Sequence, residues 1–270
     1  MKIIIRIYIC FLGIILLSGC KDLFEYHPYD VHVKGETGIN EKNSRKIKDA
    51  CLGKDTIRFV FTGDTQGWYD DTKDFVKAIN NRNDIDFIIH GGDLSDYGLT
   101  NEFIWMRDIL GKLKVPYVAL IGNHDCIGSG KDTYLKIYGE RNFTFTAGNL
   151  KFICLDTNAL EYDYSNPVPD FNFIEEQLGN EQELDMKTYF VMHARPYSEQ
   201  FNNNVARVFQ LYINTFPNIQ FCMNAHEHQV QIADLYGDGI LYYQCANIEK
   251  RNYFLFTIKP DGYNYELVEF

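Results

Sequence analysis

The chain has 270 residues, of which 46% are hydrophobic and 15% aromatic, and this is enough apolar material for one large domain or two small ones. Its formal net charge of −11 argues against a nucleic acid partner, because phosphate backbones are bound by clustered Lys and Arg. An acidic protein that works on phosphates needs a local positive centre, and bound metal ions supply one.

The N-terminal 19 residues have the pattern of a secretory signal peptide. Lys2 and Arg6 precede an apolar run over 7–17, which is too short to span a bilayer comfortably. Residues 17–20, Leu-Ser-Gly-Cys, match a bacterial lipobox, in which a peptidase cuts before Cys20 and the Cys carries the lipid. The alternative is an uncleaved anchor helix. Lipidation at Cys20 predicts a cell envelope lipoprotein, periplasmic or on the cell surface, that acyl chains attach to a membrane.

Residues 20–55 show little apolar periodicity, which predicts a tether between the lipid and a single domain over 56–270. No internal repeat or break in composition marks a further domain. No Cys-x-x-Cys occurs, and we expect the five cysteines of the body to be buried free thiols. These are Cys51, Cys126, Cys154, Cys222 and Cys245.

The body alternates between strand and helix patterns. The first three strands are expected at 57–61, 87–90 and 117–121, with helices over 70–80 and 100–113 between them. Three such βα steps predict a parallel sheet whose carboxyl edge gathers the loops that follow each strand. Further strands are expected at 151–155, 188–192 and 219–223, and helices at 173–178 and 205–216. Short strands at 230–235, 240–245, 253–258 and 265–270 predict a meander at the C-terminal end.

Candidate metal ligands follow five of these strands. They are Asp64 with Gln66, Asp93 with Asp96, Asn123 with His124, His193, and His226 with His228. Carboxylate, amide and imidazole groups are the ligands of hard and borderline cations. Four of the seven histidines fall at these strand ends, a bias that scattered core or surface histidines would not show. Taken alone, Gly122-Asn123-His124-Asp125 is also compatible with an ordinary polar turn.

The same residues resemble the five sequence blocks of the calcineurin-like metallophosphoesterase superfamily. The blocks are Gly63-Asp64-x-Gln66, Gly92-Asp93-x-x-Asp96, Gly122-Asn123-His124-Asp125, His193 and Ala225-His226-x-His228, in the order of the family. The resemblance covers roughly 57–258. It implies an α/β fold, a four-layer α/β/β/α sandwich with the metal site at the carboxyl edge of the sheets.

The resemblance also assigns roles to these residues. One metal would be held by Asp64, Gln66, Asp93 and His228, and the other by Asp93, Asn123, His193 and His226. Asp93 would bridge two ions ~3.5–4 Å apart, and a hydroxide shared by both ions would attack phosphorus. His124 resembles the catalytic His of the family, which binds no metal, and Asp125 would orient its ring.

Two positions depart from the usual family pattern. Most members have His where this chain has Gln66, and Gly where it has Ala225. An amide oxygen makes the first site harder, which favours Mn²⁺ or Fe²⁺ over Zn²⁺, and we expect manganese. The Asp64-x-Gln66 pattern is similar to a branch that contains Mn-dependent ADP-ribose/CDP-alcohol diphosphatases. The alternative for Gln66 is a residue near the first metal that does not bind it. Ala225 would strain its turn if the position required a positive φ.

Three further residues are weaker candidates for substrate binding. Arg195 could clamp a phosphate, with a surface ion pair as the alternative. Trp68 and Tyr97 could stack on an aromatic leaving group, with ordinary packing as the alternative. His90 is expected to close a strand in the core.

The sequence as a whole predicts a metal-dependent phosphoester hydrolase with a small phosphorylated substrate, and the membrane as a partner through Cys20. Phosphomonoesterase is the expected activity, and nucleotide diphosphatase or phosphodiesterase are the alternatives, because the metals handle the phosphoryl group while the loops select the rest of the substrate. From another class, a non-catalytic binding lipoprotein could keep the same fold. The sequence does not predict the oligomeric state.

Overall fold

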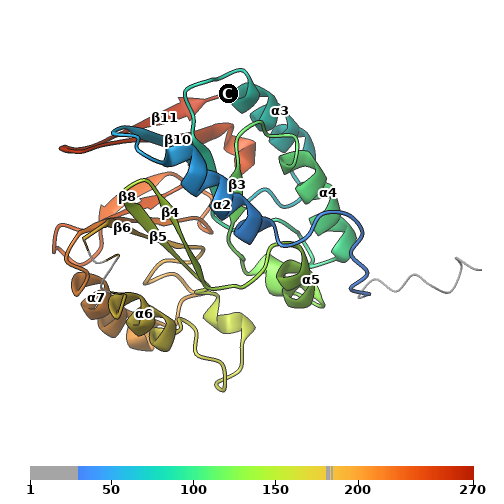
Figure 1. Ribbon diagram of the computed structural model, residues 1–270. Coiled ribbons are helices and arrows are strands. Elements are labelled where there is room, and N and C mark those ends of the chain that lie inside the picture. The colour runs from blue at the N-terminus through green and yellow to red at the C-terminus, as the bar shows by residue number, and fades with distance from the viewer. Residues whose placement is uncertain (1–29, 181–182, 184) are drawn as a thin grey trace, which may run out of the picture.

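The computed structural model describes residues 30–270 except 181, 182 and 184 (Figure 1). The predicted signal peptide and the lipid site at Cys20 therefore lie outside the described residues. Within the described part of the chain, no helix combines the length and the apolar character needed to cross a bilayer.

The first sheet has five strands in the order β11-β10-β1-β2-β3. Strands β1 (Ile57–Thr62), β2 (Phe87–His90) and β3 (Tyr117–Ala119) are parallel, as predicted. The C-terminal hairpin of β10 (Asn252–Lys259) and β11 (Gly262–Glu269) extends this sheet, because β10 pairs antiparallel with β1.

The second sheet has six strands in the order β4-β5-β6-β7-β9-β8. Its parallel centre consists of β5 (Leu150–Leu155), β6 (Lys187–Met192), β7 (Ile219–Asn224) and β9 (Leu241–Gln244). Antiparallel strands β4 (Phe143–Ala147) and β8 (Gln231–Asp234) form its edges. The predicted C-terminal meander is therefore wrong: β8 and β9 belong to the second sheet, whereas β10 and β11 complete the first.

Three apolar layers hold the two sheets and their helices together. The inner faces of the sheets meet in an aromatic core that includes Phe59, Phe152 and Phe221. The outer face of the first sheet packs against α3 (Tyr69–Asn80), α4 (Thr100–Leu110) and α5 (Gly130–Ile137). That of the second packs against α6 (Phe171–Leu178) and α7 (Ala206–Asn214). These layers form the predicted α/β/β/α sandwich (Figure 1).

Helix α2 (Ile39–Cys51) corrects the prediction of a tether over 20–55. It packs against β3 and β4, the edge strands of the two sheets, and buries Ile47 and Cys51 in the core between them. The chain before it is also attached, because the Thr100 hydroxyl donates to the Asp30 carbonyl and Arg107 donates to the Glu36 carbonyl. The domain therefore includes residues 30–55, and residues 20–29 of the predicted tether lie outside the described part.

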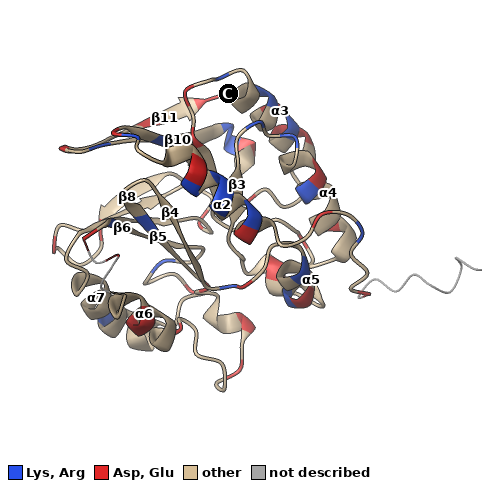
Figure 2. Ribbon diagram, viewed as in Figure 1, with Lys and Arg blue, Asp and Glu red and all other residues tan. Residues whose placement is uncertain are grey.

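The outward faces of the helices carry charges of both signs. Figure 2 shows basic and acidic residues side by side along α2 and α4. On α2, Arg45 pairs with Glu41 one turn away, and on α3, Lys73 pairs with Asp70. All five cysteines of the domain are buried and free, as predicted, because each sits among apolar side chains.

Candidate metal centre

The carboxyl ends of the central strands bring the predicted ligands to one edge of the sandwich. Asp64 and Asp93 follow β1 and β2, while His193 and His226 follow β6 and β7. None of these ligands directly follows β4, β8, β10 or β11, the strands that pair only in antiparallel fashion. This arrangement joins residues that are up to 164 positions apart, from Asp64 to His228.

Several of these ligands adopt a strained backbone. Asp64, Asp93, His226 and His228 have φ of 51°, 59°, 75° and 55°, and they are four of the six non-glycine residues with positive φ in the described chain. A left-handed conformation costs an L-residue roughly 1–2 kcal/mol. The left-handed conformations coincide with predicted ligands, which indicates that the positions of these side chains are maintained at a cost in backbone energy.

The first group of donors surrounds Asp64, whose carboxylate is fully buried. Donor atoms of Asp64, Asp93 and His228 all lie within 4.8 Å of one another. The amide nitrogen of Gln66 lies 3.2 Å from Asp93 Oδ2 and 3.4 Å from His228 Nε2.

The amide of Gln66 tests whether this group fits a cation. Its oxygen is buried with no hydrogen-bond partner. The two ends of a Gln amide have nearly the same shape, so a rotation by 180° places the oxygen between Asp93 and His228. In that orientation three oxygens and one imidazole converge, a donor set that suits a hard or borderline divalent ion. The residues present therefore fit a metal.

The second group of donors surrounds Asn123. Its amide oxygen lies 3.0 Å from His193 Nε2 and 3.0 Å from His226 Nδ1. His193 Nε2 is also 3.4 Å from Asp93 Oδ2, the oxygen that Gln66 approaches from the other side. Asp93 thus lies between the two groups, in the position predicted for a bridging ligand.

The charges of the site are poorly balanced among the protein groups alone. Burial raises the pKa of Asp64 to about 7. Burial opposes a charge on His193, but the carboxylate of Asp93 outweighs it and raises the pKa of His193 to about 10. The carboxyl groups of Asp64 and Asp93 are both buried, and divalent cations would compensate their negative charge.

His124 lies beside both groups. Its backbone N–H donates to Asp93 Oδ1 at 3.0 Å, and its ring Nδ1 is 3.7 Å from the Asp96 carboxylate. Its ring Nδ1 is 2.8 Å from the Asp96 carbonyl oxygen and donates to it. Burial works against a charged ring, but the carboxylates of Asp93 and Asp96 outweigh burial and raise the pKa of His124.

Asp125 does not orient the ring of His124, which corrects the role predicted for it. Its buried carboxylate accepts from the backbone N–H groups of Gly122, Leu94 and Ser95 and from the Ser95 hydroxyl. It therefore fastens the loop after β3 to the loop after β2. The orientation of His124 comes from the Asp96 carbonyl instead.

Ala225 and its neighbours accommodate the departure from the usual glycine. Ala225 is not among the residues with positive φ, so its turn is unstrained. A Cβ added to Gly63 or Gly91 would come within 3.0 Å of the Ala225 Cβ. The absence of side chains at those two glycines makes room for its methyl group.

The three weaker candidates for substrate binding lie outside the two donor groups. Arg195 donates to Gln244 at 3.0 Å and to Gln231 at 3.4 Å, so its guanidinium faces the β8–β9 pair, and phosphate binding by this residue stays a prediction. Trp68 and Tyr97 are 36% and 62% exposed on the loops that follow Gln66 and Asp96. Stacking by these two rings stays a prediction. His90 is buried at the end of β2, as expected.

One residue of the site was missed by the sequence analysis. Glu199 Oε1 lies 3.1 Å from Nε2 of His226. Glu199, His226 and Glu227 form a third group, which shares His226 with the second donor group and whose donor atoms lie within 4.8 Å of one another. Glu199 lies in an irregular loop, and no motif or periodicity in the sequence points to it.

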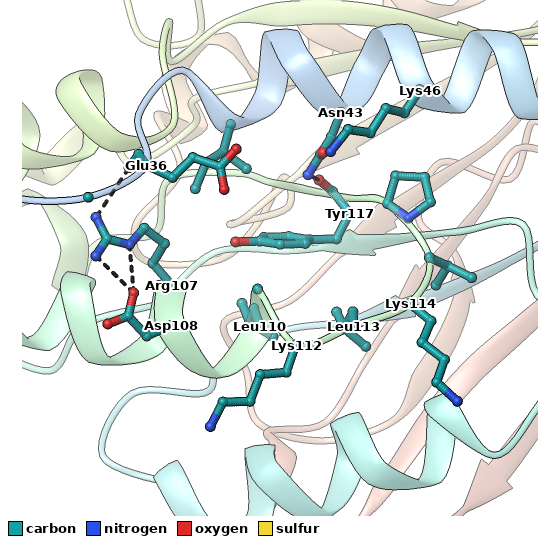
Figure 3. A pocket seen from close by; sticks show the side chains of 15 residues that line it. Glu36, Asn43, Lys46, Arg107, Asp108, Leu110, Lys112, Leu113, Lys114 and Tyr117 are labelled. Atoms are coloured by element: carbon teal, nitrogen blue, oxygen red, sulfur yellow. Dashed lines mark hydrogen bonds and ion pairs between the residues drawn. The ribbon is translucent and has the colours of Figure 1, made fainter.

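A separate cavity of about 570 Å³ opens at the other end of β3 (Figure 3). Tyr117, the first residue of β3, lines it together with Arg107 and Glu36, whereas Asn123 of the candidate metal centre lies beyond the last residue of that strand. Lys112 and Lys114 extend away from Tyr117 in Figure 3. The cavity is therefore not part of the candidate metal centre.

Comparisons with known proteins identify a family and a fold. A family model described as calcineurin-like phosphoesterase matches residues 57–230. UPF0046 protein T07D4.2 of Caenorhabditis elegans is 36% identical over 93 residues, which are 34% of this chain, and the match spans about a fifth (21%) of that curated relative.

Solved structures show the same architecture at low sequence identity. A dimetal phosphatase from Danio rerio has a TM-score of 0.62 and 12% identity, over 79% of this chain and 96% of that chain. GAP50, described as the anchor in the inner membrane complex of Plasmodium, has a TM-score of 0.58 and 15% identity, over 80% of this chain and 85% of that chain. At such identities these likenesses concern the fold alone.

Proposed function

The chain belongs to the calcineurin-like phosphoesterase family and is a hydrolase, and from this premise we propose that it cleaves a small phosphomonoester with two divalent metal ions. The observation that carries the proposal is the position of Asp93. One of its oxygens lies 3.2 Å from the Gln66 amide and 3.4 Å from the His193 ring, so a single carboxylate serves both donor groups.

The proposed metal sites follow the two donor groups. Asp64, Gln66, Asp93 and His228 would hold one ion, and Asp93, Asn123, His193 and His226 the other. Such a pair lowers the pKa of bound water and neutralises the charge of the phosphoryl group. We propose manganese, because three of the four donors of the first group are oxygens, with iron or zinc as alternatives.

The proposed role of His124 is proton transfer to the leaving oxygen. Its Nδ1 is occupied by the Asp96 carbonyl, which leaves Nε2 as the ring atom that exchanges a proton with the substrate. The carboxylates of Asp93 and Asp96 outweigh burial and raise the pKa of His124, which favours its proton-donating form. Asp125 supports the reaction only indirectly, since it fixes the loop that carries Asn123 and His124.

The test combines metal content with substrate preference. Protein purified without chelators is analysed for bound metals and assayed with an aryl phosphate, a bis-aryl phosphate and ADP-ribose, before and after addition of Mn²⁺. We expect close to two metals per chain and Mn²⁺-dependent turnover that is fastest on the monoester. Faster turnover of the diester or of ADP-ribose would replace the monoesterase by a diesterase or diphosphatase. No metal and no turnover would favour a binding protein.

Substitution of His124 separates chemistry from metal binding. His124→Asn should lower kcat by about 10²–10⁴-fold, the usual contribution of a positioned acid, while elemental analysis still finds the wild-type metal content. Asn is close in size, and the backbone bond to Asp93 remains. Loss of metal together with activity would mean that His124 acts as a ligand, and unchanged turnover would remove it from the mechanism.

A further inference from the structure

Glu199 lies on the far side of His226 from the metal groups. Nδ1 of His226 is 3.0 Å from the Asn123 amide oxygen, whereas Nε2 is 3.1 Å from Glu199 Oε1. The two nitrogens of one ring therefore face a candidate metal ligand and a carboxylate. A carboxylate accepts a hydrogen bond but donates none when ionised, so Nε2 carries the proton.

We propose that Glu199 is a positioning residue for the second metal. Its carboxylate accepts the Nε2 proton of His226, fixes the tautomer with a free lone pair on Nδ1, and holds the ring toward Asn123. This inference rests on the proposed two-metal function. Carboxylates in this relation to a metal-binding His orient the ring and increase its basicity.

The backbone on both sides of Glu199 is fixed, although its side chain is 72% exposed. Ser198 donates its N–H to the Arg195 carbonyl and accepts from the Asn203 amide. The Gln200 carbonyl accepts from the Ala159 N–H. An exposed Glu on a mobile loop would sample many positions, whereas this one starts from an anchored backbone.

The ring that receives this contact is itself restrained. The backbone N–H of His226 donates to Asp64 Oδ2 at 3.0 Å, and the side chain is 10% exposed. With the backbone held and the ring enclosed, the rotation of the imidazole and its tautomer are the properties left for Glu199 to set. Both decide whether Nδ1 can bind a cation.

Glu227 provides a matched control. It belongs to the same acidic group as Glu199, and its carboxylate is not among the partners of His226 in the described chain. Glu227→Gln therefore removes one negative charge from this group but leaves the hydrogen bond between His226 and Glu199 intact. Glu199→Ala removes both, and Glu199→Gln keeps an acceptor without the charge.

The experiment measures metal retention rather than turnover. The Mn²⁺-loaded wild type and the three variants are challenged with increasing EDTA, and the metal left per chain is determined by elemental analysis. We expect Glu199→Ala to lose one of two ions at about 10–100-fold lower chelator concentration, the usual effect of removing such a partner. Glu199→Gln should lie between Glu199→Ala and the wild type, and Glu227→Gln within about twofold of the wild type.

Two results would overturn the inference alone. The first is a Glu199→Ala protein that retains both ions as the wild type does, and the second is an equal loss in Glu227→Gln, which would assign the effect to charge. A wild type that retains no metal would instead contradict the proposed function, and the inference with it. Circular dichroism of each variant identifies a folding defect, and retention by Glu199→Gln above Glu199→Ala then still separates the roles.

Discussion

At the scale of single residues, the site depends on close approaches that only particular side chains allow. A Cβ on Gly122 would lie 2.1 Å from Oδ1 of Asp93 and 2.3 Å from its backbone nitrogen. Contacts below 3 Å require a shift, and here the neighbours are the main chain of Asp93 and its buried carboxylate, which we propose to bridge the metals, rather than the end of a flexible side chain. Gly122 thus leaves the space that the Asp93 carboxylate occupies.

We therefore expect Gly122→Ala to reduce metal content. Displacement of Asp93 disturbs both donor groups at once, so elemental analysis should find fewer than half of the ions that the wild type retains. Gly179→Ala is the control, because a Cβ there would meet only ordinary contacts at 3.5 and 3.8 Å. Wild-type metal content in Gly122→Ala would contradict this reading of the loop.

His90 offers a residue-scale prediction about pH. Its Nδ1 accepts from the Gly92 N–H and its Nε2 pairs with the Thr65 hydroxyl, an arrangement that requires a neutral ring. Burial lowers the pKa of His90 to about 3, below the value of about 6.5 in the unfolded chain. The unfolded state therefore takes up the proton first as the pH falls, and this contribution to stability is complete above pH ~6.5 and is lost progressively down to pH ~3.

Urea unfolding of wild type and His90→Gln between pH 7 and 4 checks this sign. The wild type should lose more stability than the variant over that range, because the variant cannot bind the extra proton in its unfolded state. The buried carboxylates titrate in both proteins and cancel in the comparison. Parallel curves would show that His90 does not contribute.

At the scale of elements, α2 shows why part of the fold escaped the sequence analysis. Asn40 and Asn43 belong to the polar pattern that predicted a tether, yet both are buried. The Asn40 amide donates to the Ala119 carbonyl and accepts from the Ala119 N–H, and Asn43 donates to the Tyr117 carbonyl. These amides pair with the open edge of β3 as another strand would. Such long-range partners leave no local periodicity to detect.

Asn40→Ala should consequently lower the free energy of unfolding by about 1–3 kcal/mol, since it leaves the buried Ala119 N–H without its partner, while the Ala119 carbonyl still accepts from the Tyr134 hydroxyl. Lys48→Ala, on the exposed face of the same helix, should change it by less than about 0.5 kcal/mol. Thermal or urea unfolding measures both. Equal effects of the two substitutions would mean that α2 contributes only through its apolar residues.

The parts of the fold that could be predicted from the sequence are those that local sequence signals determine. Strands β1, β2 and β3 and their ligands follow from local signals, because an apolar run ends directly in a Gly-Asp or Gly-Asn turn. The separation of β9 from β10 into different sheets does not, since both read as short apolar strands and only pairing partners distinguish them. The same holds for the contacts of Asp125 and Glu199, because their partners are distant in sequence: Asp125 accepts from Leu94 and Ser95, and Glu199 contacts His226.

At the scale of the whole molecule, the predicted lipid at Cys20 would limit how the domain can sit on a membrane. The chain enters the domain at Asp30, beside Thr100 at the start of α4, and the Val31 carbonyl accepts from Lys136 of α5. Cys20 lies ten residues before Asp30. Ten residues span at most about 35 Å, so an anchor at Cys20 would keep the ends of α4 and α5 that contact this segment near the lipid.

We propose that Cys20 carries this anchor, and Cys20→Ser tests it. Without the thiol that receives the lipid, the protein should leave the membrane fraction while its turnover on a phosphoester stays unchanged, because the metal centre lies in a separately folded domain. Cys51→Ser is the control: Cys51 is fully buried in the core, so its substitution should lower stability but not detach the protein. Fractionation measures the distribution, and mass spectrometry of the wild-type N-terminus identifies the modification. A wild type that retains Met1, or a Cys20→Ser protein that stays with the membrane as the wild type does, would refute the anchor.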